Sequence, residues 1–333
     1  RYGRSGGSSR GKGENVPVMP AAEVMVDVPL VRSLLHEQHP DLATLPLERI
    51  SNGWDNAIFR LGEGPGDSSY TVRLPRRRIA VQLLLNEQRW LPVYAAATSV
   101  PVPAPLRLGR PSALFPWPWS VNPWFDGVTA LGRDPARRAG LAVPLARFLA
   151  DIHRPAPGDA PRNPVRGLPL ASRDQAFRAR LESGAVPQPR RLLSLWEELV
   201  AVPNWQGPAL WLHGDLHPGN ILQYDDVLLH DGVPQRDGIR QHNGELAAVI
   251  DFGDLTRGDP ATDLATAWMT FDADGRRAFR AELDRLTGTD ADTWQRARGW
   301  ALNIASAMLL HSDDSPPLFE LGRHTVAQLL AEA

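Results

Sequence analysis

The sequences HGDLHPGN at residues 213–220 and VIDFGD at residues 249–254 carry the strongest chemical signal in this chain. They place two carboxylates, Asp215 and Asp251, and the amide of Asn220 on turns beside short apolar runs. Phosphoryl transfer needs a base near the acceptor hydroxyl and oxygen ligands that hold magnesium on the phosphates. These three side chains could supply both.

The spacing within the first stretch fits the catalytic-loop pattern H-x-D-L-x-x-x-N, and Asp-Phe-Gly after a strand is its usual second element. Asp215 is therefore the predicted catalytic base, and Asn220 and Asp251 are the predicted Mg²⁺ ligands. His213 belongs to the same catalytic loop, and we expect it to fix the loop rather than to react. Magnesium is the one metal that this pattern implies.

HGDLHPGNIL followed by VIDFGDLTRGDPATDLA resembles the aminoglycoside phosphotransferase family, which is related to protein kinases. From about Val28 onward, the resemblance implies an α+β, protein-kinase-like fold with two lobes. The N-terminal lobe would be small and built on an antiparallel sheet, and the C-terminal lobe larger and mainly helical. The implied reaction moves the γ-phosphoryl group of ATP or GTP to a small-molecule hydroxyl. Gly214 precedes Asp215 where protein kinases prefer arginine, which favours a small-molecule acceptor.

The resemblance also implies a nucleotide site in the first lobe. Arg73, in YTVRLPRR, would contact the nucleotide phosphates and pair with Glu87 in LLNEQRW. Arginine replaces the lysine of protein kinases, but its planar fork can still bind phosphate and carboxylate. The turn at residues 51–56 would be the nucleotide-binding loop, with Gly53 and Asn56 as its contacts. One glycine is a weak phosphate cradle, so the resemblance alone supports that assignment.

Asp263, in GDPATDLA, resembles a family acid that braces the catalytic loop, and we predict a structural role for it. An antibiotic acceptor, and with it antibiotic resistance, is one implication of the resemblance. Acids late in the chain could attract a cationic aminoglycoside or simply form a solvated helix face. They are Glu282, Asp284, Asp290, Asp292, Asp313 and Asp314.

Other functions stay open at this point. His213, Asp215 and His217 could bind a metal such as zinc, but that leaves Asn220 and Asp251 unexplained. A nucleotide-binding regulator without turnover would keep the fold, although the intact motif residues oppose it. A kinase of a non-antibiotic metabolite fits the same residues. A protein kinase is opposed by the absence of an Ala-Pro-Glu motif after Asp-Phe-Gly.

The composition of the chain limits the classes of binding partner that we expect. The formal net charge of −2 gives no overall attraction for nucleic acid or anionic lipid. Cysteine is absent, which excludes disulfides and thiolate chemistry. No apolar run approaches the roughly 20 residues of a membrane-spanning helix. We therefore expect a soluble, cytoplasmic protein whose partners are a nucleoside triphosphate and a small-molecule acceptor, not nucleic acid or a membrane.

The pattern divides the chain into a disordered tail or leader at residues 1–24, a nucleotide-binding lobe at 25–126 and a catalytic and substrate-binding lobe at 127–333. A polar insertion at 225–244 is predicted to be an exposed loop between two short strands. Periodicity and turn residues predict helices at 28–40 and 79–94 and strands at 56–61 and 70–74.

Overall fold

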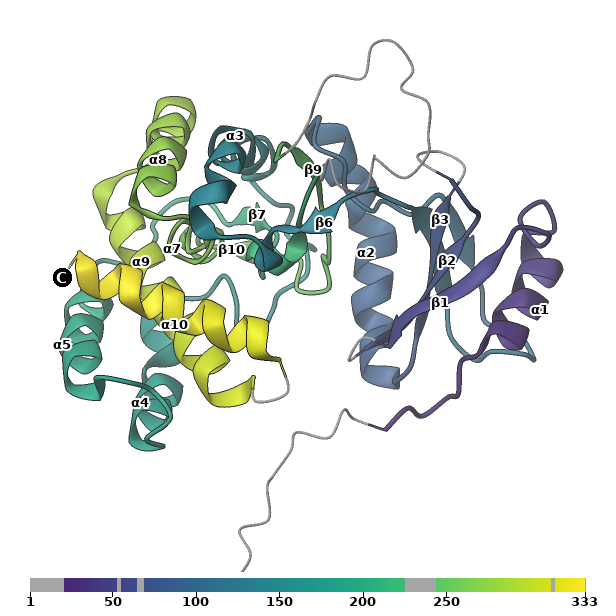
Figure 1. The fold of residues 1–333 in the computed structure, drawn as a ribbon, viewed down its shortest axis with the longest axis horizontal. Helices are drawn as coiled ribbons and strands as arrows, with labels where there is room; N and C mark the ends of the chain where they lie inside the picture. Colours follow the sequence, from purple (N-terminus) through teal and green to yellow (C-terminus); the bar gives the residue numbers. More distant parts are fainter. Residues whose placement is uncertain (1–20, 53–54, 65–68, 225–243, 313–314, 333) are drawn as a thin grey trace, which may run out of the picture.

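The computed structural model describes residues 21–52, 55–64, 69–224, 244–312 and 315–332. Most of the predicted leader, Gly53 and nearly all of the predicted insertion lie outside these ranges. The rest forms two lobes (Figure 1), with the smaller N-terminal lobe in purple and blue and the larger lobe in teal to yellow.

The small lobe is built on a five-stranded antiparallel sheet with strand order β1-β2-β3-β5-β4. Its strands are β1 (Leu47–Asn52), β2 (Asn56–Leu61), β3 (Tyr70–Pro75), β4 (Arg107–Gly109) and β5 (Trp119–Pro123). The predicted hairpin is confirmed, because β2 pairs with β3 from Asn56↔Pro75 to Leu61↔Tyr70.

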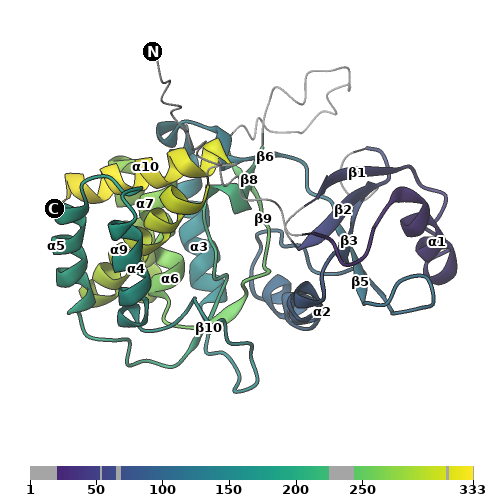
Figure 2. The ribbon, with the colours of Figure 1, turned by 90° about the horizontal axis from the view of Figure 1, so that it is seen from below.

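The two faces of this sheet bury different partners. Ala57, Phe59 and Leu61 alternate along β2 and pack with α1 (Val28–Gln38) in one apolar cluster. Such alternation is what a half-buried strand requires. Figures 1 and 2 both place α1 on the outer side of the sheet and α2 (Arg78–Ala97) on the side of the large lobe.

The chain passes between the lobes just after β5. Gly127, which has φ +143, comes directly before β6 (Val128–Thr129). A Cβ at this position would lie 2.8 Å from the carbonyl oxygen of Gln223, so glycine lets the connector run against β8 (Ile221–Gln223).

The large lobe is mainly helical and carries two small sheets. One sheet has the order β6-β8-β9, with β9 at Leu246–Val249, and the other pairs β7 (Leu210–Leu212) with β10 (Thr256–Gly258). Helix α9 lies at its centre and contacts α4, α5, α6 and α10. The helices are α3 (Ala142–Ile152), α4 (Asp174–Glu182), α5 (Pro189–Val200), α6 (Ala261–Leu264), α7 (Thr266–Thr270), α8 (Ala273–Thr287), α9 (Ala291–His311) and α10 (Pro316–Ala331), and the 3-10 turns are η2 (Ala130–Gly132), η3 (Pro135–Leu141), η4 (Leu170–Arg173) and η5 (Pro218–Asn220).

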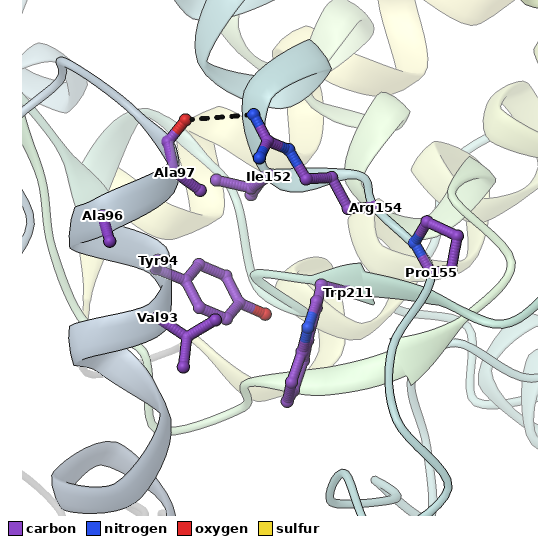
Figure 3. A pocket seen from close by; sticks show the side chains of 8 residues that line it. All are labelled: Val93, Tyr94, Ala96, Ala97, Ile152, Arg154, Pro155 and Trp211. Atoms are coloured by element: carbon purple, nitrogen blue, oxygen red, sulfur yellow. Dashed lines mark hydrogen bonds between the residues drawn. The ribbon is translucent and has the colours of Figure 1, made fainter.

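The C-terminal half of α2 packs against the large lobe. Leu91 and Tyr94 belong to the apolar core of that lobe, and the Tyr94 hydroxyl donates to the carbonyl of Leu212 at 3.0 Å. A pocket of about 270 Å³ opens at this contact (Figure 3), with Tyr94 and Trp211 on its walls. In the figure the Arg154 guanidinium reaches back toward the carbonyl of Ala97.

None of the helices in the described ranges is both long and apolar enough to cross a lipid bilayer.

Candidate active site

The catalytic loop connects β7 to β8 and makes its first turn at Gly214. This glycine has φ +89, and a Cβ there would lie 2.1 Å from the carbonyl oxygen of Asp254. Both the backbone conformation and the close approach exclude a side chain. Glycine before Asp215 therefore has a packing reason in this fold, apart from any preference for an acceptor.

Asp263, on α6, holds the start of the loop. Its side chain is fully buried, and its two oxygens accept hydrogen bonds from the backbone N–H groups of His213 and Gly214, each at 2.8 Å. His153 Nε2 contacts the same carboxylate at 3.1 Å. A buried carboxylate with several donors is firmly held, so these contacts fix the backbone from which Asp215 projects.

His213 is buried and uses both ring nitrogens inside the protein. Nε2 donates to the carbonyl of Ile250 at 2.9 Å, and Nδ1 accepts from the backbone N–H of Asp215 at 3.2 Å. The ring therefore ties the catalytic loop to the end of β9. Neither nitrogen is free to bind zinc, and among the described residues no group of three His, Cys, Asp or Glu side chains could hold a metal ion.

Asp215 is held by two cationic or hydrogen-bonding side chains. Its Oδ1 accepts from Nη2 of Arg166 at 3.1 Å, and its Oδ2 lies 3.5 Å from Nε2 of His217. Burial works to raise the pKa of Asp215, but the hydrogen bond and charge of His217 and the guanidinium of Arg166 outweigh it and hold that pKa well below its usual range. The carboxylate is thus ionised at neutral pH.

The β8–β9 hairpin brings Asn220 and Asp251 together. The backbone N–H of Ile250 donates to the carbonyl of Asn220 at 2.9 Å, and the Asn220 side chain donates from Nδ2 to the Asp215 carbonyl at 2.9 Å. Asp251 has φ +62 and an exposed carboxylate at the following turn. Carboxylate and amide oxygens are what Mg²⁺ prefers, so this donor set fits magnesium.

The small lobe contributes an ion pair next to Asp251. Arg73, on β3, binds Glu87 of α2 through two hydrogen bonds of 2.5 and 3.1 Å, and both residues are buried. Burial works to lower the pKa of Arg73, but the carboxylates of Glu87 and Asp251 outweigh it and raise that pKa. A Cβ built on Gly253 would lie 3.5 Å from Asp251 Oδ1 and 3.9 Å from Glu87 Oε1. The two lobes therefore meet at these three charged side chains.

The predicted nucleotide-binding loop is described only in part. Gly53 lies outside the described residues. Asn56 begins β2 on the same face as Arg73, since Ile58, two residues on, pairs with Arg73 across the strands. Its Oδ1 is buried without a hydrogen-bond partner among the described residues. The contacts of Gly53 and Asn56 with nucleotide stay predictions.

The sequence profile of the phosphotransferase enzyme family matches residues 46–233 and 236–300. The match covers both halves of the site, from Arg73 and Glu87 to Asp263. The chain belongs to this family. It is accordingly a phosphotransferase, and the resemblance found in its motifs is confirmed. At the sequence level, no protein of curated function matches it.

Solved structures show how widely this phosphotransferase shares its fold. The GDP complex of a wild-type aminoglycoside 2'-phosphotransferase is 18% identical, covers 91% of this chain and 98% of its own, and has a TM-score of 0.61. A macrolide 2'-phosphotransferase from Brachybacterium faecium is 18% identical, covers 90% of this chain and 98% of its own, and has a TM-score of 0.57. An aminoglycoside phosphotransferase from Streptomyces rimosus is 22% identical, covers 89% of this chain and 99% of its own, and has a TM-score of 0.52. The predicted two-lobed, kinase-like fold is confirmed.

The sequence did not reveal Arg166, although it touches the predicted base of the phosphotransferase. Besides its contact with Asp215, its Nε donates to the Gly214 carbonyl at 2.9 Å. It lies in a proline- and glycine-rich loop that contacts the residues on either side of β10. Asn163 donates to Asp254 at 2.6 Å, and the carbonyl of Gly167 accepts from the Asp259 N–H at 3.2 Å. The loop also holds Asp159, Arg162 and Asn163, so no local pattern set Arg166 apart from its neighbours.

Proposed function

We propose that this phosphotransferase moves the γ-phosphoryl group of ATP or GTP to a hydroxyl of a small molecule, with Asp215 as catalytic base. The observation that carries the proposal is the position of the Asp215 carboxylate. It is ionised, held by Arg166, and tied through Asn220 to the turn that bears Asp251. A base and a magnesium-type donor set on adjacent turns are what phosphoryl transfer requires.

Arg73 would bind and orient the nucleotide phosphates. Its guanidinium is held by Glu87 through two bonds, which limits its motion and leaves its charge directed at the junction of the lobes. Asn220 and Asp251 would hold Mg²⁺, which when bound neutralises charge on the phosphate oxygens. This part of the proposal rests on three side chains that meet there: Arg73 and Glu87 from the small lobe and Asp251 from the large lobe.

Asp215 would accept the proton of the acceptor hydroxyl. As the acceptor oxygen bonds to the γ-phosphorus, the bond from that phosphorus to the β–γ bridging oxygen breaks, and the nucleoside diphosphate leaves. The strongly lowered pKa of Asp215 makes it a weak base. A weak base is sufficient because the transition state is loose and the hydroxyl becomes acidic only as its bond to phosphorus forms.

The acceptor would be a small molecule rather than a protein segment. The motif lacks the Arg-Asp pair and the Ala-Pro-Glu sequence of protein kinases. Solved proteins of similar fold are named for aminoglycosides and for a macrolide, so these antibiotics belong in the first acceptor assays. Because nucleoside triphosphates are cytoplasmic metabolites, the proposal also places the protein in the cytoplasm.

Nucleotide turnover by the parent and by Asp215→Asn tests the function. We expect magnesium-dependent hydrolysis or transfer by the parent and a decrease of about 10²- to 10⁴-fold in kcat for the variant, the usual range for losing a general base. Nucleotide affinity, measured by calorimetry, should be nearly unchanged. Turnover within a few-fold of the parent would remove Asp215 from its role. A parent that binds nucleotide but never hydrolyses or transfers it would instead be a regulator.

A further inference from the structure

Three arginines lie along residues 166–180, a segment that begins beside the catalytic loop: Arg166, Arg173 and Arg180. Arg166 contacts the catalytic carboxylate, Arg173 ends η4, and Arg180 projects from α4 toward α9. The side chain of Leu170 presses on α9, since a Cβ at Gly299 would lie 2.2 Å from it. The positive charges of this segment therefore run from Arg166, beside the predicted base, to Arg180, beside α9.

Arg166 pairs with the carboxylate of Asp215, but no carboxylate among the described residues balances the charges of Arg173 and Arg180. Arg180 donates from Nε to the hydroxyl of Ser306 at 2.9 Å and from Nη2 to Asn303, both of which are neutral. Arg173 makes no hydrogen bond or ion pair with any residue that the structure describes, and its Nε is buried. The adjacent acid, Asp174, binds Arg178 and the indole N–H of Trp196 instead.

The arginines also repel one another. Burial, and then the charge of Arg166, lower the pKa of Arg173. Burial and the charges of Arg173 and Arg166 lower the pKa of Arg180 to about 10. Both side chains remain charged at neutral pH, so the folded protein holds crowded like charges at a cost in stability. Such arrangements are concentrated at functional sites, where a ligand completes the charge balance.

Three of the acids that could have attracted an aminoglycoside, Glu282, Asp284 and Asp290, have structural partners. Glu282 binds Arg147 at 2.8 Å and also Arg285. Asp284 accepts from the indole N–H of Trp294 at 2.7 Å, and Asp290 caps the N-terminus of α9. Asp292 lies in the first turn of that helix, and Asp313 and Asp314 are outside the described residues. The described acids therefore form helix caps and surface pairs rather than a cation site beside Asp215.

We propose that the acceptor carries a carboxylate or phosphate group, which Arg173 and Arg180 bind while the acceptor hydroxyl lies at Asp215. This inference rests on the phosphotransferase function proposed above and specifies its acceptor class. Guanidinium forks match both oxyanions. A polyamine such as an aminoglycoside would place further positive charge beside Arg173 and Arg180, which disfavours its binding there.

Inorganic phosphate is the probe for the anion site. The full chain is first saturated with Mg²⁺ and a non-hydrolysable triphosphate analogue, so that the nucleotide site is filled, and phosphate is then titrated in a calorimeter. We expect binding in the millimolar range or tighter, weakened at least about 10-fold by Arg173→Gln and by Arg180→Gln, since each removes a charge-assisted contact. Arg178→Gln, on the same helix but paired with Asp174, is the matched control and should bind phosphate like the parent.

An acceptor panel on one sugar scaffold tests the preference itself. It contains glucose, glucosamine, glucuronate and glucose 6-phosphate, with kanamycin as a polycation. We expect kcat/KM for the anionic sugars to exceed that for glucose and glucosamine by at least about 10-fold, the effect of one charge-assisted contact. Glucuronate and glucose 6-phosphate tell a carboxylate site from a phosphate site. Arg173→Glu should reverse the order by favouring glucosamine and kanamycin.

The outcomes separate this inference from the proposed function. Efficient phosphorylation of kanamycin, with anionic sugars excluded, overturns the anionic acceptor and leaves the phosphotransferase function standing. Absence of phosphate binding at tens of millimolar, or equal weakening by Arg173→Gln and Arg178→Gln with circular dichroism spectra like the parent's, overturns it as well. Absence of all magnesium-dependent turnover would defeat the proposed function, and the phosphate titration would still decide the anion site.

Discussion

At the scale of single residues, Arg166 has the most specific task that the sequence did not reveal. It donates to the Gly214 carbonyl and to Asp215 Oδ1, at 2.9 and 3.1 Å. Through these contacts it orients the predicted base and, together with His217, keeps the pKa of Asp215 low. We describe it as a positioning residue, because it acts on the acceptor only through Asp215.

Arg166→Gln should change the pH dependence of the enzyme. Burial favours the neutral acid, and Arg166 is one of the groups that outweigh burial, so its loss raises the pKa of Asp215. The carboxylate then becomes protonated at a higher pH, and activity on the acid side is lost earlier than in the parent. The looser base should also lower kcat about 10- to 100-fold. The measurement is kcat/KM from pH 4 to 8 at saturating nucleotide. Arg162→Gln, an exposed site in the same loop, is the control, and superimposable profiles for Arg166→Gln and the parent would contradict the role.

Glycine at position 214 of the motif can be explained in more than one way. From the sequence, glycine before the aspartate indicated a small-molecule acceptor. The structure adds a steric requirement, since a Cβ would lie 2.1 Å from the Asp254 carbonyl oxygen. That contact joins residues far apart in the chain, so no local pattern could have predicted it.

Gly214→Ala should destabilise the fold by at least about 2 kcal/mol, the combined effect of a strained φ and a close contact. Gly184→Ala separates the two causes. Gly184 has a similar φ of +80, but nothing lies within 4 Å of its Cβ position. Its substitution should cost only about 1 kcal/mol. Urea unfolding of both variants gives the difference, and equal losses would show that the contact with Asp254 is relieved at little cost.

At the scale of elements, periodicity predicted most of the local structure. The strand at 56–61 was predicted with the bounds that the structure has, and the helix at 79–94 extends by a few residues to Arg78–Ala97. The pairing of β7 with β10 and of β3 with β5 was not predicted. Strands of three residues such as β7 carry too few positions to show a period. Pairing across an intervening helix depends on packing that the local sequence does not record.

The β8–β9 hairpin supports a prediction about the insertion at 225–244, of which residues 225–243 lie outside the described ranges. The hairpin is closed by Tyr224, whose N–H donates to the Glu245 carbonyl at 3.0 Å and whose carbonyl accepts from Gly244 at 3.1 Å. A short glycine-containing turn in place of residues 226–243 should therefore connect the strands without strain.

Stability of the shortened protein should equal that of the parent or slightly exceed it, because loop-closure entropy changes by only about 0.6 kcal/mol per doubling of length. Nucleotide hydrolysis should survive, since Ile250 still bonds to Asn220. Thermal unfolding and a hydrolysis assay check both points. An unfolded product, or lost activity toward an acceptor that the parent phosphorylates, would assign the insertion a part in the core or in the acceptor site.

At the scale of the whole molecule, the lobes share one helix. The sequence predicted lobes at 25–126 and 127–333, and these boundaries stay a prediction. Yet Leu91 and Tyr94, which precede the connector, are packed in the core of the large lobe. Hydrophobic periodicity marks which residues are buried, but not which neighbouring core buries them. The lobe boundary that the sequence predicted therefore places all of α2 in the small lobe, whereas the packing places its C-terminal half in the core of the large lobe.

Tyr94 is the residue through which we expect the lobes to unfold together. Its ring lies 5.5 Å from Phe252 and 5.4 Å from Trp211, and its hydroxyl donates to the buried carbonyl of Leu212. Phe252 in turn lies 4.5 Å from His213 of the catalytic loop. A side chain with contacts to the Asp-Phe-Gly turn and the catalytic loop couples α2 to the site in the large lobe.

Two substitutions at Tyr94 distinguish the hydrogen bond from the packing. Tyr94→Phe keeps the ring contacts and leaves the Leu212 carbonyl short of a donor, so it should cost about 1–3 kcal/mol and keep one unfolding transition. Tyr94→Ala removes the ring and should cost about 3–5 kcal/mol. It should also separate the unfolding of the small lobe from that of the large lobe. Calorimetry reports this as a ratio of van't Hoff to calorimetric enthalpy near one for the parent and Tyr94→Phe and well below one for Tyr94→Ala. A single cooperative transition for Tyr94→Ala would mean that other contacts between the lobes, such as the approach of Arg73 and Glu87 to Asp251, are sufficient to couple them.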